Sequence, residues 1–260
     1  MRSIDYEAEF NARAMVPEHP AIFERWARDA AAHRAEAGGV PELAYGDTPR
    51  QAMDVFGTGP GTMPVAMFIH GGWWRAMDRS QFSHMARGLN AHGIAVAVAG
   101  YDLCPQVSIA EIVAQMRRAV RFLAARTGRR VVAFGHSAGG HLAATLAATE
   151  PSVAAGYAIS GVFDLLPLLE VSMNADFRLD AASARTLSPL YGPKAQTFDC
   201  AVGALESNAF KLQSRALSDA WAAPYVEIEG ANHFTVLDPL SDPNSAMVAR
   251  LAQICATCLS

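Results

Sequence analysis

A serine inside a glycine-rich pentapeptide constrains the fold of this chain more than any other feature. The sequence GHSAG at residues 135–139 follows an apolar run at residues 131–134 and precedes a helix-like stretch at residues 141–147. A serine on a sharp strand-to-helix turn has a strained backbone and an exposed hydroxyl, and glycines on either side let the strand and the helix approach each other. The pattern is typical of a nucleophile elbow, and we therefore predict Ser137 as a catalytic nucleophile.

A second glycine pair follows another strand-like run. The sequence HGGWW at residues 70–74 comes directly after the buried-strand pattern of residues 65–69. Glycines let the main chain turn its N–H groups inward, and two such donors are needed where negative charge develops on an attacked carbonyl oxygen. We predict an oxyanion hole built from main-chain groups at Gly71, Gly72 or Trp73 together with the N–H of Ala138.

One histidine stands in the right place to be the base. In hydrolases with this elbow the chain order is serine, acid, histidine, so the base must lie well beyond Ser137. Of the eight histidines, only His233 does so. It follows the strand-like residues 225–228, and the carboxyl edge of a parallel sheet is where such side chains gather.

Several carboxylates are candidates for the acid. Glu206 follows the carboxyl end of the strand-like residues 198–205, on the edge where Ser137 and His233 are expected. Asp199 begins the same strand, about 20 Å away at roughly 3.3 Å per residue, and so lies at the wrong edge. Asp164 also leaves the carboxyl edge of a strand-like run. We predict Glu206, with Asp164 as the alternative.

The alternation of strand and helix patterns predicts an α/β fold with a mostly parallel central sheet and helices on both faces. At 260 residues and 51% hydrophobic composition, the chain is long enough for one large domain, which we expect over residues 1–260. We expect an N-terminal helix over about residues 20–37 and a small lid insertion over about residues 165–194. The other expected elements are strands at 42–45, 51–56, 65–69, 94–99 and 131–134, and helices at 80–92 and 108–126.

Composition argues against several classes of partner. The formal charge of −4 does not indicate a basic surface that could bind nucleic acid. No apolar run is long enough to span a membrane and the first nine residues do not read as a signal peptide, so we expect a cytoplasmic protein without a membrane partner. Four cysteines are too few for a disulfide scaffold, and we read the spacing of Cys255 and Cys258 as chance. We predict no metal and no cofactor.

These motifs resemble those of the α/β-hydrolase fold, and within it the kynurenine formamidases (arylformamidases) and small carboxylesterases. The loop at residues 70–74 resembles the H-G-G-x-W loop of kynurenine formamidases, and residues 135–142, 160–165 and 233–237 carry further similarity, from about Tyr6 to the C-terminus. The resemblance implies Ser137 as nucleophile, Glu206 as acid and His233 as base. Many members of the superfamily use aspartate where this chain has Glu206.

The resemblance also implies a cofactor-free serine hydrolase acting on a small molecule, either an aryl formamide such as N-formylkynurenine or a small-acyl ester or amide. A general carboxylesterase or carbamate hydrolase is the alternative. A non-catalytic ligand-binding relative is a remote one, since such proteins usually lack a member of the triad. The side chains expected to line the substrate pocket are those of Trp73, Trp74, His136, Phe163 and Phe234. The sequence leaves the oligomeric state open.

Overall fold

We describe a computed structural model of the chain, covering residues 4–57 and 65–257. These residues form an eight-stranded sheet in the order β1-β2-β4-β3-β5-β6-β7-β8. The strands β3 to β8 are parallel, and β2 runs antiparallel to both of its neighbours. The strand bounds are β1 (Gly39–Ala44), β2 (Ala52–Phe56), β3 (Val65–Ile69), β4 (Ala95–Ala99), β5 (Val131–His136), β6 (Val153–Ile159), β7 (Phe198–Gly203) and β8 (Tyr225–Ile228).

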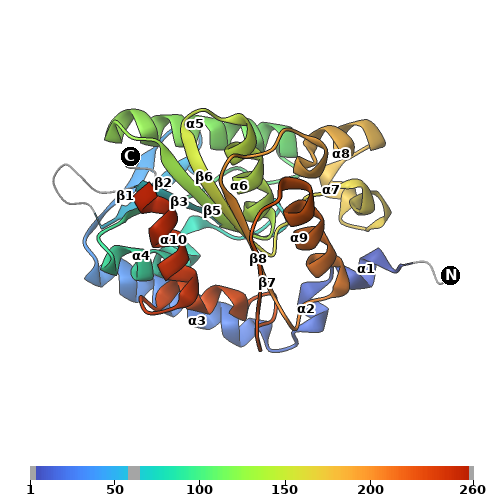
Figure 1. Ribbon diagram of the computed structural model, residues 1–260, viewed down its shortest axis with the longest axis horizontal. Coiled ribbons are helices and arrows are strands. Elements are labelled where there is room, and N and C mark those ends of the chain that lie inside the picture. Colours follow the sequence, from blue (N-terminus) through green and yellow to red (C-terminus); the bar gives the residue numbers. More distant parts are fainter. Residues whose placement is uncertain (1–3, 58–64, 258–260) are drawn as a thin grey trace.

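Helices cover both faces of the sheet. In Figure 1 α5 lies above the strands, and α3 and α4 lie below them. The predicted fold class, a mostly parallel sheet with helices on both faces, is therefore confirmed. The helix bounds are α1 (Tyr6–Glu9), α2 (Ala12–Met15), α3 (His19–Glu36), α4 (Arg87–Ala91), α5 (Ile109–Thr127), α6 (Ala138–Thr149), α7 (Asn174–Phe177), α8 (Ala181–Leu187), α9 (Asn208–Trp221) and α10 (Ala246–Thr257).

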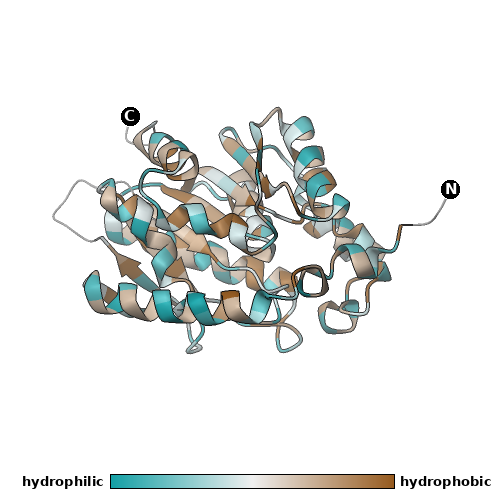
Figure 2. Cartoon of the chain, turned by 90° about the horizontal axis from the view of Figure 1, so that it is seen from below, coloured by the Kyte–Doolittle hydropathy of each residue, from teal (hydrophilic) through white to brown (hydrophobic). Residues whose placement is uncertain are grey.

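The central strands are buried along their whole length. Every residue of β3, β4 and β5 is buried, as expected for parallel strands that helices cover on both faces. Figure 2, seen from the side of α3, shows hydrophobic strands inside and a mixture of hydrophilic and hydrophobic residues on the helices around them. The predicted strands at residues 65–69 and 225–228 have the predicted bounds, and the other predicted strands differ at their ends by one to three residues.

The prediction of one helix over residues 80–92 is wrong. The structure has two short 3-10 turns, Arg79–Gln81 and Ser83–Ala86, before α4. Phe82 joins the two turns with φ −124° and ψ 10°, which is outside the helical range, and its ring lies 5.4 Å from that of Trp26 on α3. The segment Ser83–Ala86 is buried throughout, so tertiary packing decides its backbone and overrides the helical periodicity.

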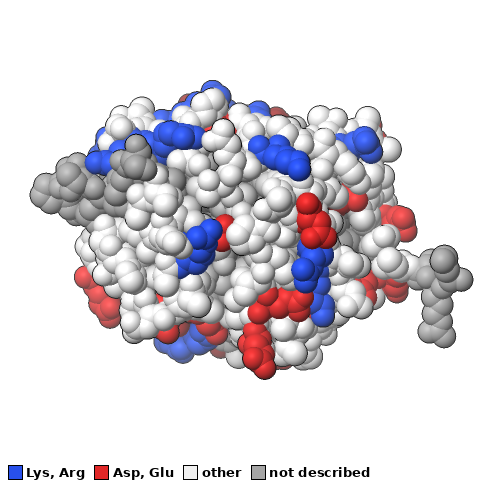
Figure 3. Space-filling view, viewed as in Figure 1, with Lys and Arg blue, Asp and Glu red and all other residues white. Residues whose placement is uncertain are grey.

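Short helices also make up the stretch over residues 165–194, which the sequence predicts as a lid. They are the 3-10 turns Leu166–Glu170 and Pro189–Tyr191 and the helices α7 and α8 between them. No helix among the described residues is both long and apolar enough to cross a membrane. On the face shown in Figure 3, basic and acidic side chains are interspersed among uncharged ones.

Candidate active site

Ser137 occupies the turn between β5 and α6 with φ 55° and ψ −118°. A positive φ is strained for any residue with a side chain, so this is the conformation expected of a nucleophile elbow. The flanking glycines are required by the close packing. A Cβ atom on Gly139 would lie 2.0 Å from the carbonyl oxygen of Ile69, and one on Gly135 would lie 2.4 Å from that of Gly139.

Glu206 and His233 form a buried pair beside this turn. The distance between Glu206 Oε2 and His233 Nδ1 is 2.5 Å, and the exposed fractions of the two side chains are 0% and 7%. The other carboxylate oxygen of Glu206 accepts hydrogen bonds from Ser160 Oγ at 2.5 Å and from the N–H of Gly203 at 2.7 Å. Three donors thus surround the carboxyl group, as a buried polar group requires. With Nδ1 bound to Glu206, Nε2 is the nitrogen that His233 can offer to a reacting group.

Asp164, the alternative acid, lies apart from His233. Its Oδ2 accepts a hydrogen bond from the hydroxyl of Tyr191 at 2.9 Å, and its Oδ1 accepts one from the N–H of Leu166 at 3.0 Å. Both contacts tie the carboxylate to the segment that follows β6. The structure therefore brings Glu206, and not Asp164, to the histidine.

The loop after β3 lies directly against the elbow. A Cβ atom on Gly71 would lie 2.9 Å from the carbonyl oxygen of His136 and 3.0 Å from Ser137 Cβ, so only glycine allows this approach. The loop then turns through left-handed conformations at Gly72, Trp73 and Trp74, whose φ angles are 103°, 53° and 54°. This run of positive φ values is the strained backbone of the predicted oxyanion loop.

The Gly71 carbonyl is held from one side. His70 Nδ1 lies 2.7 Å from the Gly71 carbonyl oxygen, and the hydroxyl of Tyr101 lies 3.4 Å from it. Burial lowers the pKa of His70 to about 4, so its ring is neutral and Nδ1 can donate one proton. Because the peptide is planar and trans, the N–H of Gly72 points away from these donors. Among residues 4–57 and 65–257, no hydrogen-bond acceptor is assigned to the N–H groups of Gly72, Trp73 or Ala138.

His136 holds the loop that carries His233. Its Nε2 lies 2.8 Å from the carbonyl oxygen of His233, and the centroids of the two rings are 4.7 Å apart. Burial, assisted by the neighbouring His233, lowers the pKa of His136 well below its usual value. The neutral ring can therefore donate one hydrogen bond, which fixes the backbone of the histidine loop.

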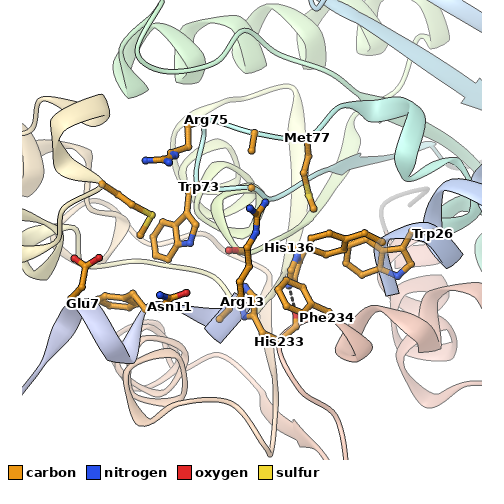
Figure 4. A pocket seen from close by; sticks show the side chains of 17 residues that line it. Glu7, Asn11, Arg13, Trp26, Trp73, Arg75, Met77, His136, His233 and Phe234 are labelled. Atoms are coloured by element: carbon orange, nitrogen blue, oxygen red, sulfur yellow. Dashed lines mark hydrogen bonds between the residues drawn. The ribbon is translucent and has the colours of Figure 1, made fainter. Parts of the chain in front are cut away.

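A cavity of about 310 Å³ joins these residues. Ser137 and His233 both line it, as do three of the five predicted pocket residues, Trp73, His136 and Phe234 (Figure 4). The remaining lining residues are Glu7, Phe10, Asn11, Ala12, Arg13, Phe23, Trp26, Gly72, Arg75, Ala76, Met77 and Met173. The cavity is small, and five of its seventeen lining residues are Phe or Trp.

Two predicted pocket residues do not line this cavity, and these assignments are corrected. Trp74 is fully buried and packs edge-on against His141 and Phe177, because its backbone turns the indole into the protein. Phe163 belongs to a separate apolar cluster that includes Phe198 and Trp221. Both side chains are core residues.

Two features of the site were not predicted from the sequence: the N-terminal wall of the cavity and the hydrogen bond from Ser160 to Glu206. The N-terminal segment, defined as residues 4–16, supplies Phe10, whose ring packs edge-on against those of Trp73 and Phe210. No periodicity in so short a segment predicts a contact with α9. Ser160 was open to prediction, because it follows β6 at the same sheet edge as Glu206.

No group of three or more His, Cys, Asp or Glu side chains among the described residues is placed to hold a metal ion. Burial raises the pKa of the Cys104 thiol to about 11 and that of Cys200 to about 12, so both are protonated at neutral pH. Cys258, half of the Cys255 and Cys258 pair, lies outside the described residues.

Several known proteins resemble this chain in sequence. The BD-FAE family model matches residues 54–170, which include the glycine loop after β3 and the turn at Ser137. Kynurenine formamidase of Salmo salar is 27% identical over 224 residues, covering 77% of this chain and 76% of that protein. Kynurenine formamidase of Drosophila melanogaster is 28% identical over 228 residues, covering 76% of each.

Solved structures of other proteins superpose on this chain. The crystal structure of a "putative thioesterase" from Silicibacter sp. TM1040 superposes with a TM-score of 0.89 at 35% identity, covering 95% of this chain and 98% of that one. Esterase B of Lactobacillus rhamnosus superposes with a TM-score of 0.66 at 23% identity, covering 94% and 97%, and so shows a shared fold. The chain is therefore a hydrolase of the α/β-hydrolase family that resembles arylformamidases and carboxylesterases.

Proposed function

We propose that the protein is a serine hydrolase that cleaves small-acyl esters or aryl formamides through an acyl-enzyme on Ser137. The observation that carries this proposal is the Glu206–His233 hydrogen bond at the wall of the cavity that Ser137 also lines. Nucleophile, base and acid come from three separate loops after β5, β8 and β7, at one edge of the sheet. A Ser, His and carboxylate set placed in this way is the usual apparatus for acyl transfer.

The first half-reaction forms the acyl-enzyme. His233 Nε2 takes the proton of Ser137 Oγ while Nδ1–H donates to Glu206, which stabilises the imidazolium. The serine oxygen bonds to the carbonyl carbon, and the carbonyl electron pair moves onto the oxygen. When the tetrahedral intermediate collapses, the bond to the leaving group breaks, and the leaving aniline or alcohol receives the proton from Nε2.

The second half-reaction restores the enzyme. Water gives a proton to His233 and attacks the acyl carbon, and the serine oxygen leaves with that proton as the acid product departs. In both half-reactions the negative oxygen needs fixed N–H donors. The N–H groups of Gly72, Trp73 and Ala138, which have no acceptor among the described residues, support this role.

Cavity size and relatives support a small acyl group. The Trp73 indole extends from the predicted oxyanion loop, lines the cavity and packs against the rings of Phe10, Phe177 and Phe210. A braced indole leaves little room beside the attacked carbonyl, so formyl and acetyl groups fit better than long chains. The kynurenine formamidase relatives favour an aryl formamide such as N-formylkynurenine, and the esterase neighbours favour an ester.

A labelling experiment tests the mechanism directly. A fluorophosphonate probe should add its mass to the peptide containing Ser137 and should not label Ser137→Ala. The matched control is Ser80→Ala, a surface serine outside the cavity, which should label like the wild type. Labelling that persists in Ser137→Ala would refute the assignment. Rates on formanilide and phenyl acetate would then separate a formamidase from a carboxylesterase.

A further inference from the structure

Arg13 brings a positively charged side chain into the cavity. It lies on α2 and lines the cavity together with Ser137 and His233. Figure 4 shows its side chain reaching into the middle of the cavity, between Trp73 and Asn11 on one side and His233 and Phe234 on the other. Across residues 4–57 and 65–257, the Arg13 guanidinium takes part in no hydrogen bond and no ion pair; its carbon lies 5.7 Å from the centre of the Phe23 ring.

The other charged side chains of the cavity are already engaged. Arg75 Nη1 lies 2.6 Å from Asp176 Oδ2, so this cation has its counter-ion. The two carboxylate oxygens of Glu7 accept hydrogen bonds from the N–H and the hydroxyl of Ser172 at 2.6 and 2.7 Å. Arg13 is left as the charged group that can bind something new.

The position of Arg13 is set by its helix. The side chain of Asn11 caps α2 by accepting a hydrogen bond from the N–H of Ala14 at 3.1 Å. Ala12 and Val16 are buried, which anchors the turn on either side of the arginine. These contacts fix the backbone at Arg13, and the guanidinium stands at the end of an exposed side chain.

We propose that Arg13 binds a carboxylate on the substrate, away from the carbonyl that is attacked, so that the enzyme prefers aryl substrates that carry a carboxylate. This inference rests on the proposed function and adds its substrate class. A guanidinium presents paired N–H donors that match the two oxygens of a carboxylate. The aromatic side chains of Phe23, Trp26 and Phe234 in the cavity wall suit an aryl group.

The test compares two formamides that differ only by the charge. Formanilide is neutral, and 3-formamidobenzoate carries a carboxylate on the same ring. We define the selectivity as kcat/KM for the charged compound divided by that for the neutral one; comparing it between variants cancels the intrinsic reactivity of each compound. For Arg13→Gln we expect the selectivity to fall about tenfold, mainly through KM, as for loss of a charge-assisted hydrogen bond.

Arg28→Gln is the matched control, because Arg28 lies on α3 outside the cavity with a side chain that is 72% exposed. It should keep the wild-type selectivity. Raising the salt concentration should lower the selectivity of the wild type and of Arg28→Gln but leave that of Arg13→Gln unchanged. An Arg13→Gln enzyme with wild-type selectivity would overturn the inference while leaving the serine mechanism intact.

A binding measurement keeps the inference testable if neither formamide is hydrolysed, an outcome that would count against the proposed function alone. Calorimetric titration of 3-formamidobenzoate into the wild type and into Arg13→Gln should give a Kd about tenfold weaker in the variant, with formanilide binding changed less. Equal Kd values for 3-formamidobenzoate in the two proteins would overturn the inference.

Discussion

Replacing Glu206 with glutamine keeps the shape of the side chain and removes its charge. In the wild type, Oε1 accepts the N–H of Gly203 and the hydroxyl of Ser160, while Oε2 faces His233 Nδ1. A main-chain N–H can only donate, so the oxygen of the new amide must take the place of Oε1. The amide NH2 then faces Nδ1.

The magnitude follows from this forced orientation. With a donor in front of Nδ1, the His233 ring must carry its proton on Nε2, and Nε2–H cannot accept the proton of Ser137. A wrong tautomer of this kind lowers kcat by about 10⁴-fold. At about 1.36 kcal/mol for each factor of ten, the loss of transition-state stabilisation is about 5.5 kcal/mol.

The assay is kcat for p-nitrophenyl acetate hydrolysis, with circular dichroism and Tm to show that the variant is folded. Asp164→Asn is the control and should retain kcat within about twofold, because that carboxylate is bonded to Tyr191 and Leu166 instead. A folded Glu206→Gln enzyme that keeps more than about a tenth of the wild-type kcat would refute the tautomer argument. If Asp164→Asn lost more kcat than Glu206→Gln, Asp164 would be the acid instead.

Three further outcomes are expected. Ser137→Ala and His233→Ala should each lower kcat by about 10⁵ to 10⁶-fold and the double variant scarcely further, since the two act as a unit; additive losses in steady-state assays would contradict this. The kcat/KM of the wild type should fall steeply from acetyl to octanoyl p-nitrophenyl esters, and Trp73→Ala should flatten the series; equal rates on both esters would exclude a small acyl site. Burial lowers the pKa of His84 to about 4, so only the unfolded chain takes up this proton between pH 6.5 and 4, and stability is lost as the pH falls through that window. His84→Leu should therefore narrow the difference in Tm between pH 7 and pH 5, and an unchanged difference would exclude His84 as a cause.

The strained turn at Ser137 and the position of Glu206 could be predicted, because each follows from a local requirement of the backbone. The turn needs glycine at position 139, because a Cβ atom there would lie 2.0 Å from the carbonyl oxygen of Ile69. Such a requirement leaves glycines at a fixed spacing from the serine, which the sequence shows directly. The assignment of Glu206 followed from its place at the end of a strand, since the carboxyl ends of parallel strands share one edge. Both inferences depend on a few residues that are close in sequence.

The pocket lining could not be predicted in the same way, because it depends on which distant segments meet. Trp73 and Trp74 are neighbours with almost the same φ angle, 53° and 54°, yet Trp73 lines the cavity and Trp74 is buried, because successive side chains leave the loop in different directions. Arg13 could not be predicted as a cavity residue, because it is the fold that brings it beside Ser137 and His233, which are more than 100 positions away in the sequence. Local sequence patterns do not predict which distant residues come into contact.

The hydrogen bonds of the N-terminal segment bear on the order in which the active site is assembled during synthesis. Glu7 binds Ser172, 165 residues later, and Glu9 accepts the N–H of Ala209 at the start of α9, 200 residues later. This wall of the cavity is made before its partners, and its contacts with α9 can form only after α9 has been made. Closing loops of this length is slow compared with forming local helices, so we expect the nascent chain to pair strands β1 to β7 before it completes the substrate pocket.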